Sequence, residues 1–155
     1  MKKILIALFL ISFVNYSGIS QDKKTYKVSK TTKEWKSILT PMQFYVLRKA
    51  GTERRNSSPL NNNYKKGLYV CAACNTPLYK SKNKYDSRSG WPAFDSAIEK
   101  NVELDVDYKI GYARTEIKCN TCGGHLGHAF NDGPTKTTGI RHCINGAALN
   151  FIPKK

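Results

Sequence analysis

The chain has 155 residues, of which 40% are hydrophobic, 24% charged and 11% aromatic, a globular composition that excludes a wholly disordered chain and a multi-span membrane protein. Lysine and arginine outnumber aspartate and glutamate by 26 to 11, so the formal net charge is +15. Because the basic residues are spread along the chain, they indicate a solvated surface first, with attraction to anionic surfaces and acidic partners as the alternative.

Residues 1–20 have the pattern of a secretory signal peptide. A basic start precedes the apolar run 4–14, which is too short to span a bilayer, and Gly18 and Ser20 supply the small residues of a cleavage site. An uncleaved N-terminal anchor is the alternative. Cleavage leaves 24 basic and 11 acidic residues, a net charge of +13. We expect export to the periplasm or the outside, no stable membrane insertion after cleavage, and therefore no nucleic-acid partner.

Residues 21–30 are polar and rich in lysine, which predicts a flexible basic arm ahead of a single domain over 31–155. The Thr31-x-x-Glu34 spacing is that of a capping box and predicts a helix there. Three- and four-residue spacing gives this helix an apolar face, formed by Trp35, Ile38 and Leu39.

A second helix is predicted over 42–50, because Thr40-Pro41 combines an N-cap residue with proline at the first helical position. Phe44 and Leu47 face inward, and Gly51 stops the helix. After a polar loop over 52–66, short strand-like runs alternate with turn signals, which predicts a mostly antiparallel β domain without βαβ units. The predicted strands are Gly67–Cys71, Pro77–Lys80, Val102–Val106, Tyr108–Tyr112, Arg114–Lys118, Leu126–Phe130 and His142–Phe151.

Four of the five cysteines form two Cys-x-x-Cys pairs, Cys71 with Cys74 and Cys119 with Cys122. Two such turns supply the four thiolates of a tetrahedral zinc site, so we expect one structural Zn²⁺ per chain. The alternatives are two disulfides, which export favours, or a redox-active dithiol. A ligand set that includes a nearby histidine is a further possibility.

Cys143 is the remaining cysteine, and it lies in a strand-like run in which Arg141 and Asn145 share its face. A nearby cation lowers a thiol pKa, and His125 and His128, flanked by glycines, are candidates for moving protons. The alternative for Cys143 is a small buried hydrophobe. Trp91, in Gly-Trp-Pro, is either a pocket wall or an ordinary core tryptophan.

Together these motifs resemble the B-type methionine-R-sulfoxide reductases. The resemblance spans about residues 35–152, and it implies a mainly β fold of two antiparallel sheets, of the Mss4-like or β-tent type, with small N-terminal helices and a structural zinc. The matching segments are Gly51-Thr52-Glu53, 67–74, 84–87, 90–94, Arg114-Thr115-Glu116, 119–122, 125–130, 132–134 and 141–145.

The resemblance implies that Cys143 is the nucleophile, which attacks the sulfur of methionine-R-sulfoxide in a protein or peptide and becomes a sulfenic acid. It implies that His125 and His128 are the pocket histidines, one of which positions or protonates the sulfoxide oxygen, and that Asn145 helps to orient the site. Trp91 would pack on the substrate methyl group, and Arg141 would line the substrate site. The expected role is the repair of oxidised proteins, with the zinc held by Cys71, Cys74, Cys119 and Cys122.

The chain departs from the family pattern at three positions. Ser89 stands where many members have a second, resolving cysteine, so we expect an external thioredoxin-like protein or small thiol to reduce Cys143 directly. Gly146 replaces a common serine, and His142 replaces an aromatic residue. We expect a monomer. Two other functions stay open on the residues alone, namely a zinc-pinned binding module, which the charge favours, and a secreted disulfide-bonded domain with a free thiol.

Overall fold

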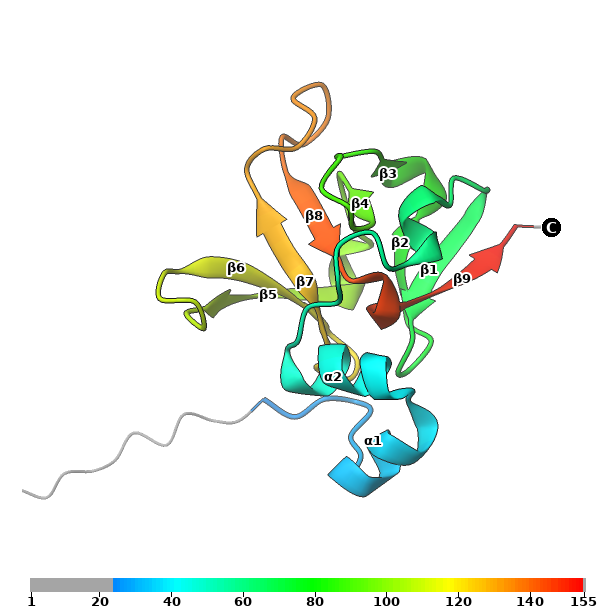
Figure 1. Ribbon diagram of the computed structural model, residues 1–155, viewed down its shortest axis with the longest axis vertical. Helices are drawn as coiled ribbons and strands as arrows, with labels where there is room; N and C mark the ends of the chain where they lie inside the picture. The colour runs from blue at the N-terminus through cyan, green and yellow to red at the C-terminus, as the bar shows by residue number, and fades with distance from the viewer. Residues whose placement is uncertain (1–23, 155) are drawn as a thin grey trace, which may run out of the picture.

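The computed structural model of the chain describes residues 24–154. Two antiparallel sheets meet at a shared core, and two short helices cover one end (Figure 1). The predicted mainly β fold is therefore confirmed. The predicted signal peptide over 1–20 lies outside the described residues.

The two helices begin where their capping signals predict. Helix α1 (Thr32–Ile38) starts at a complete Thr31/Glu34 capping box, and α2 (Pro41–Lys49) starts at a second box formed by Thr40 and Gln43. Helix α2 ends one residue earlier than predicted, because Ala50 takes the left-handed conformation with φ of 48°. The predicted inward position of Ile38 is wrong, since its side chain is 54% exposed at the end of α1.

The smaller sheet has the strand order β2-β1-β9. Its strands are β1 (Gly67–Cys71), β2 (Pro77–Lys80) and β9 (Leu149–Pro153). The larger sheet has the order β3-β4-β8-β7-β6-β5. Its strands are β3 (Lys84–Tyr85), β4 (Ala93–Phe94), β5 (Val102–Asp107), β6 (Arg114–Cys119), β7 (His125–Phe130) and β8 (Arg141–Ile144). Four 3₁₀ turns complete the described secondary structure, η1 (Pro59–Asn62), η2 (Ser81–Asn83), η3 (Glu99–Asn101) and η4 (Gly146–Ala148).

Two predicted strands differ from the structure. Residues 108–112 form the turn between β5 and β6, where Gly111 has φ of 89°, and their apolar side chains are exposed and not packed on a sheet. The predicted strand 142–151 breaks at η4 into β8 and β9, which belong to different sheets. Because β3 and β4 have only two residues each, they are too short for a sequence pattern to reveal.

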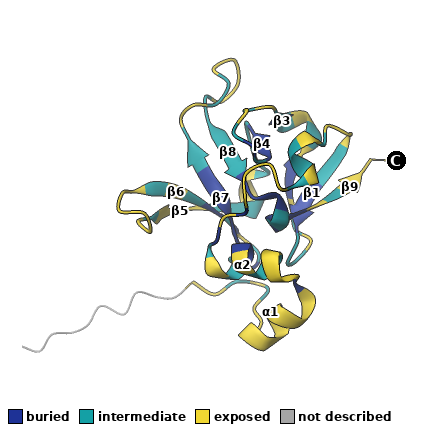
Figure 2. Ribbon diagram, viewed as in Figure 1, coloured by how far each residue is buried: buried dark blue, intermediate teal, exposed yellow. Residues whose placement is uncertain are grey.

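Aromatic side chains join the two sheets. Phe94 of the larger sheet stacks on Tyr79 with ring centroids 4.2 Å apart and meets Tyr69 edge-on at 5.0 Å, and all three rings are fully buried. Removing such a ring from a core costs about 3–5 kcal/mol. Figure 2 shows the buried residues in this central zone and the exposed outer surface of α1.

The described part of the predicted arm, residues 24–30, contains neither helix nor strand and contacts the domain. Lys24 pairs with Glu103, and the Val28 N–H donates to the Thr121 carbonyl at 2.9 Å. The ring of Tyr26 covers Gly123, where a side chain would collide with it. Within residues 24–154, neither helix is long and apolar enough to cross a membrane.

Candidate active site and metal centre

The two Cys-x-x-Cys pairs meet in space and form a thiol cluster. The four Sγ atoms all lie within 4.8 Å of one another, and three of the four cysteines are buried. The cluster joins the two sheets, because Cys71 ends β1 and Cys119 ends β6.

The two turns have the same local geometry. The residue after each second cysteine, Asn75 or Gly123, has a positive φ, and its N–H donates to the carbonyl of the first cysteine at 2.8 Å. Gly123 therefore closes a tight turn after the second pair, and Asn75 forms its counterpart after the first pair without glycine. Both turns direct their two thiols at the same point.

The sulfur spacing fits a tetrahedral ion. The Sγ atoms of Cys71 and Cys122 are 3.8 Å apart, and those of Cys74 and Cys119 are 3.6 Å apart. A zinc ion with bonds of about 2.3 Å separates its sulfurs by about 3.8 Å, whereas a disulfide needs about 2.05 Å. All five cysteines are free thiols. The four paired cysteines can thus hold one metal ion, and the disulfide alternative does not describe this geometry.

Cys143 lies on β8, between His128 of β7 and Ala93 of β4 in the strand register. It opens into a cavity of about 180 Å³, smaller than the roughly 300–1,000 Å³ of pockets for drug-sized ligands. The cavity therefore suits a single side chain. Its lining residues are Thr52, Trp91, Arg114, Gly127, His128, Phe130, Cys143 and Asn145.

Opposing effects act on the Cys143 thiol. Burial raises its pKa, because the thiolate is the form that loses solvation. The Ser89 hydroxyl, 3.8 Å from Sγ, and the Arg141 guanidinium both act to lower the pKa. Burial prevails, so the thiol form predominates at neutral pH and the thiolate is a minority species.

His128 is held by a carboxylate from another strand. Its Nε2 lies 2.8 Å from Oδ2 of Asp107, which also binds Arg114. The pKa of Asp107 is lowered by the Lys109 backbone N–H and by His128 and Arg114, so it is an anion that can only accept. The pKa of His128 is lowered, chiefly by burial. The neutral ring must therefore donate from Nε2 to Asp107, which leaves Nδ1 unprotonated.

His125 lies behind His128 and does not line the cavity. The two rings meet edge to face with centroids 5.2 Å apart. Nδ1 of His125 contacts Oε1 of Glu116, and its buried Nε2 has no hydrogen-bond partner among residues 24–154. Of the two predicted histidines, His128 is thus the one that faces the cavity.

Glu53 connects the remaining parts of the site, although the sequence offered no role for it beyond a family motif. Its buried carboxylate accepts hydrogen bonds from the N–H groups of Gly146 and Ala147, and its carbonyl accepts one from Nε1 of Trp91 at 3.1 Å. Its N–H donates to Oδ1 of Asn145 at 2.9 Å. Glu53 therefore fixes the indole and the backbone that follows Cys143.

Asn145 and Arg141 are each committed to protein partners. Nδ2 of Asn145 donates to the Leu126 carbonyl at 3.0 Å, so both ends of its amide are in use. Arg141 makes a two-point ion pair with Asp132, at 2.8 Å for each bond, and its guanidinium lies 4.5 Å from the Phe130 ring. Arg141 borders the thiol but does not line the cavity.

The two residues before Cys143, Arg141 and His142, point to opposite faces of β8. His142 lies on the far side of β8, where Nδ1 is 3.2 Å from the hydroxyl of Tyr79, and burial lowers its pKa. It has no direct contact with the thiol. From the sequence, no role was assigned to Asp107, Glu53 or Arg114. The family motifs Gly51-Thr52-Glu53 and Arg114-Thr115-Glu116 were signals for two of them, and Asp107 had none.

Known proteins have sequences similar to most of this chain. The family described as the SelR domain matches residues 39–153. The chain is 50% identical over 127 residues to the peptide methionine sulfoxide reductase MsrB of Leptospira interrogans, which covers 81% of this chain and 96% of that protein. It is 45% identical over 133 residues to the protein of the same name from Agrobacterium fabrum, covering 85% and 98%. It is 44% identical over 138 residues to the mitochondrial methionine-R-sulfoxide reductase B3 of Mus musculus, covering 88% and 54%.

Proposed function

The chain belongs to the SelR domain family of B-type methionine-R-sulfoxide reductases, and on that premise we propose that it reduces methionine-R-sulfoxide in proteins and peptides with Cys143 as the nucleophile. It is an oxidoreductase, a peptide-methionine (R)-S-oxide reductase, that repairs oxidised proteins. The observation that carries the proposal is the meeting of Cys143, His128 and Trp91 around one cavity of about 180 Å³.

The first step forms a bond between Cys143 and the substrate sulfur. The thiolate attacks the electrophilic sulfur of the sulfoxide, and the protonated minority form of His128 gives its proton to the sulfoxide oxygen. As this oxygen passes to Cys143, the bonds from the substrate sulfur to oxygen and to Cys143 break, methionine leaves with the electron pair, and Cys143 becomes a sulfenic acid. The Arg114 Nε, which is buried and has no partner within residues 24–154, is free to donate to a substrate oxygen. Trp91 packs on the substrate methyl group, and this contact selects the R epimer of the sulfoxide.

His125, Asn145 and Arg141 serve as positioning groups in this proposal. His125 supports the His128 ring from behind, and Asn145 ties the chain after Cys143 to Leu126 and Glu53. Arg141 adds positive charge beside the thiol and so favours the thiolate.

An external thiol completes the cycle. Two equivalents of thiol reduce the sulfenic acid to the Cys143 thiol and water and form one disulfide among themselves. Ser89 supports this route, because a hydroxyl, and not a second thiol, lies 3.8 Å from Sγ of Cys143. The other four cysteines are held together in the metal centre. A thioredoxin-like protein or a small thiol is the expected reductant.

Zn²⁺ is the metal that we propose for the thiol cluster, one ion per chain. The all-thiolate donor set and the 3.6–3.8 Å sulfur spacing support it. Bound there, the ion would cross-link β1 and β6 without taking part in the reaction.

The signal pattern of residues 1–20 supports export to the periplasm or the outside, after which the chain would act as a monomer. Fractionation of cells that produce the full chain tests this, because an exported protein is found outside the cytoplasm and starts at residue 21. Full-length protein retained in the cytoplasm contradicts it.

The reaction is tested with separated R and S epimers of peptide methionine sulfoxide, with dithiothreitol as reductant. We expect turnover of the R epimer alone, and its loss in Cys143→Ser. If zinc-loaded, folded protein reduces neither epimer, the enzyme proposal is wrong and a binding module takes its place.

A further inference from the structure

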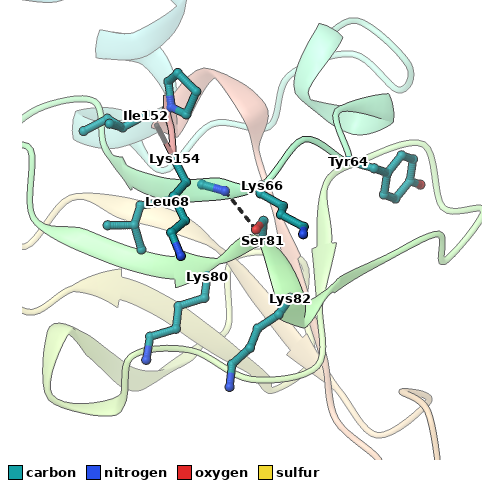
Figure 3. Close-up of a pocket in the computed structure, with 10 residues that line it drawn as sticks. Tyr64, Lys66, Leu68, Lys80, Ser81, Lys82, Ile152 and Lys154 are labelled. Carbon is teal, nitrogen blue, oxygen red and sulfur yellow. Dashed lines mark hydrogen bonds between the residues drawn. The ribbon is translucent and has the colours of Figure 1, made fainter.

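A second cavity lies on the outer face of the smaller sheet, away from Cys143. It has a volume of about 640 Å³ and shares no lining residue with the active-site cavity. The apolar side chains of Leu68 on β1 and Ile152 on β9 line the cavity from neighbouring strands, and Tyr64 lies at one side (Figure 3). Four exposed lysines surround them, and we call the site the lysine cavity: Lys66, Lys80, Lys82 and Lys154.

The strand register gathers lysines that are distant in sequence. Leu68 of β1 lies opposite Lys80 of β2 on one side and Ile152 of β9 on the other, so the three side chains share one face. Beyond the ends of β1 and β9, the Lys154 N–H donates to the Lys66 carbonyl, so these two lysines are also neighbours. The even spread of basic residues along the sequence therefore becomes a local concentration of charge.

Within residues 24–154, no side chain neutralises the charge of the lysine cavity. No carboxylate lines it, and none of its four lysines forms an ion pair with any residue between 24 and 154. Four neighbouring ammonium groups around an apolar floor raise the local affinity for an anion carried on an apolar body.

We propose that the lysine cavity binds the headgroup of an anionic phospholipid and so docks the protein on an anionic membrane surface. Clusters of four or more basic side chains beside a membrane-spanning segment or on an amphipathic helix bind anionic lipid headgroups, and the lysine cavity gathers four lysines around apolar side chains on the face of a sheet. An acidic peptide fits less well, because β1 is the central strand and its N–H groups are already paired with β2 and β9, so the cavity offers side chains only. The smaller sheet and the β5–β6 hairpin lie on opposite sides of the molecule (Figure 1). The inference does not depend on the proposed reaction.

The first test is a titration of the isotope-labelled full chain with monomeric dihexanoyl-phosphatidylglycerol, followed by NMR. We expect saturable shifts at residues 66–68, 80–82 and 152–154, and none with dihexanoyl-phosphatidylcholine. Shifts spread over the surface, or none, overturn the proposal. Equal affinity for inorganic phosphate overturns the lipid in favour of a simple anion site. Tighter binding of a hexaglutamate peptide at the same residues overturns it in favour of an acidic protein.

The second test measures sedimentation of the full chain with vesicles of phosphatidylcholine containing phosphatidylglycerol. We expect Lys80→Gln/Lys82→Gln to weaken binding about thirtyfold, from two lysines at the membrane surface. The matched control, Lys27→Gln/Lys33→Gln, removes the same charge from α1 and the segment before it, where neither residue lines the cavity, and should change binding by less than about threefold. Equal losses in both double variants would overturn a specific site. Methionine sulfoxide reduction reports that each variant is folded.

Discussion

Asp107→Asn tests whether the carboxylate on β5 positions the proton donor. The amide keeps the size of Asp107 and still offers an oxygen to Nε2 of His128, but it removes the negative charge 2.8 Å from that ring. Asp107 raises the pKa of His128 against the larger opposing effect of burial, so its loss lowers this pKa further. Arg114 also loses its ion-pair partner.

The magnitude follows from the populations of the reactive form. The step needs a Cys143 thiolate and a protonated His128, and this combination is a minority because the pKa of the thiol is raised and that of the imidazole is lowered. The fraction of protein in this reactive form falls tenfold for each unit by which the His128 pKa is lowered. An opposite charge in direct contact shifts a pKa by roughly one to three units, so kcat/KM should fall by about tenfold or more.

The assay is kcat/KM for an R-sulfoxide peptide across the pH range, with Asp105→Asn as the matched control. Asp105 lies on the same strand but is half-exposed and pairs with Lys118. We expect Asp107→Asn to lose activity mainly in kcat and to move the acid limb of the profile to lower pH, while Asp105→Asn stays near wild type. Unchanged kcat/KM and an unchanged acid limb in Asp107→Asn would refute the reasoning.

Four further predictions follow from the site. Ser89→Cys should form a disulfide with Cys143 during turnover, detectable by mass spectrometry of peptides without reductant, because the two side chains are 3.8 Å apart; a persistent sulfenic acid contradicts this. In the wild type, kcat/KM should be flat between an acid limb below 6.5, from the lowered His128 pKa, and an alkaline limb above 9, from the raised Cys143 pKa; an alkaline limb near pH 7 would show an activated thiolate. Glu53→Gln should destabilise the fold by about 1–3 kcal/mol and lower kcat, since one buried N–H loses its acceptor. Denaturant unfolding measures the loss of stability, and a variant as stable as the wild type would contradict a structural role for the Glu53 carboxylate. Removal of zinc by a chelator should lower the melting temperature sharply, because structural zinc contributes about 10 kcal/mol or more to folding; an unchanged melting temperature argues against a structural ion.

Sequence patterns predicted the features that depend on neighbouring residues. The capping boxes at Thr31 and Thr40 and the two Cys-x-x-Cys turns are each complete within a few residues, so their geometry follows from local chemistry. The strand predicted over 108–112 was wrong because that prediction also used local composition alone. A strand-like composition does not show whether a neighbouring strand is available for pairing.

Features that depend on strand register were outside the reach of a single sequence. His128 meets Asp107 only because β5, β6 and β7 are aligned, and the Glu53 carboxylate reaches the N–H of Gly146 across 93 residues of chain. His125 and His128 lie on the same strand, and His128 is the one that faces the cavity because the register of β7 with β8 places it opposite Cys143.

In the proposed reaction, Cys143 takes the oxygen from the substrate. The most direct measurement is a single turnover of the R-sulfoxide peptide without reductant, with a sulfenic-acid trap and mass spectrometry of every cysteine peptide. We expect one methionine formed per protein chain and one trapped oxidation, on Cys143. Methionine formation with Cys143 unmodified, or with the oxidation on a metal-centre cysteine, would contradict it.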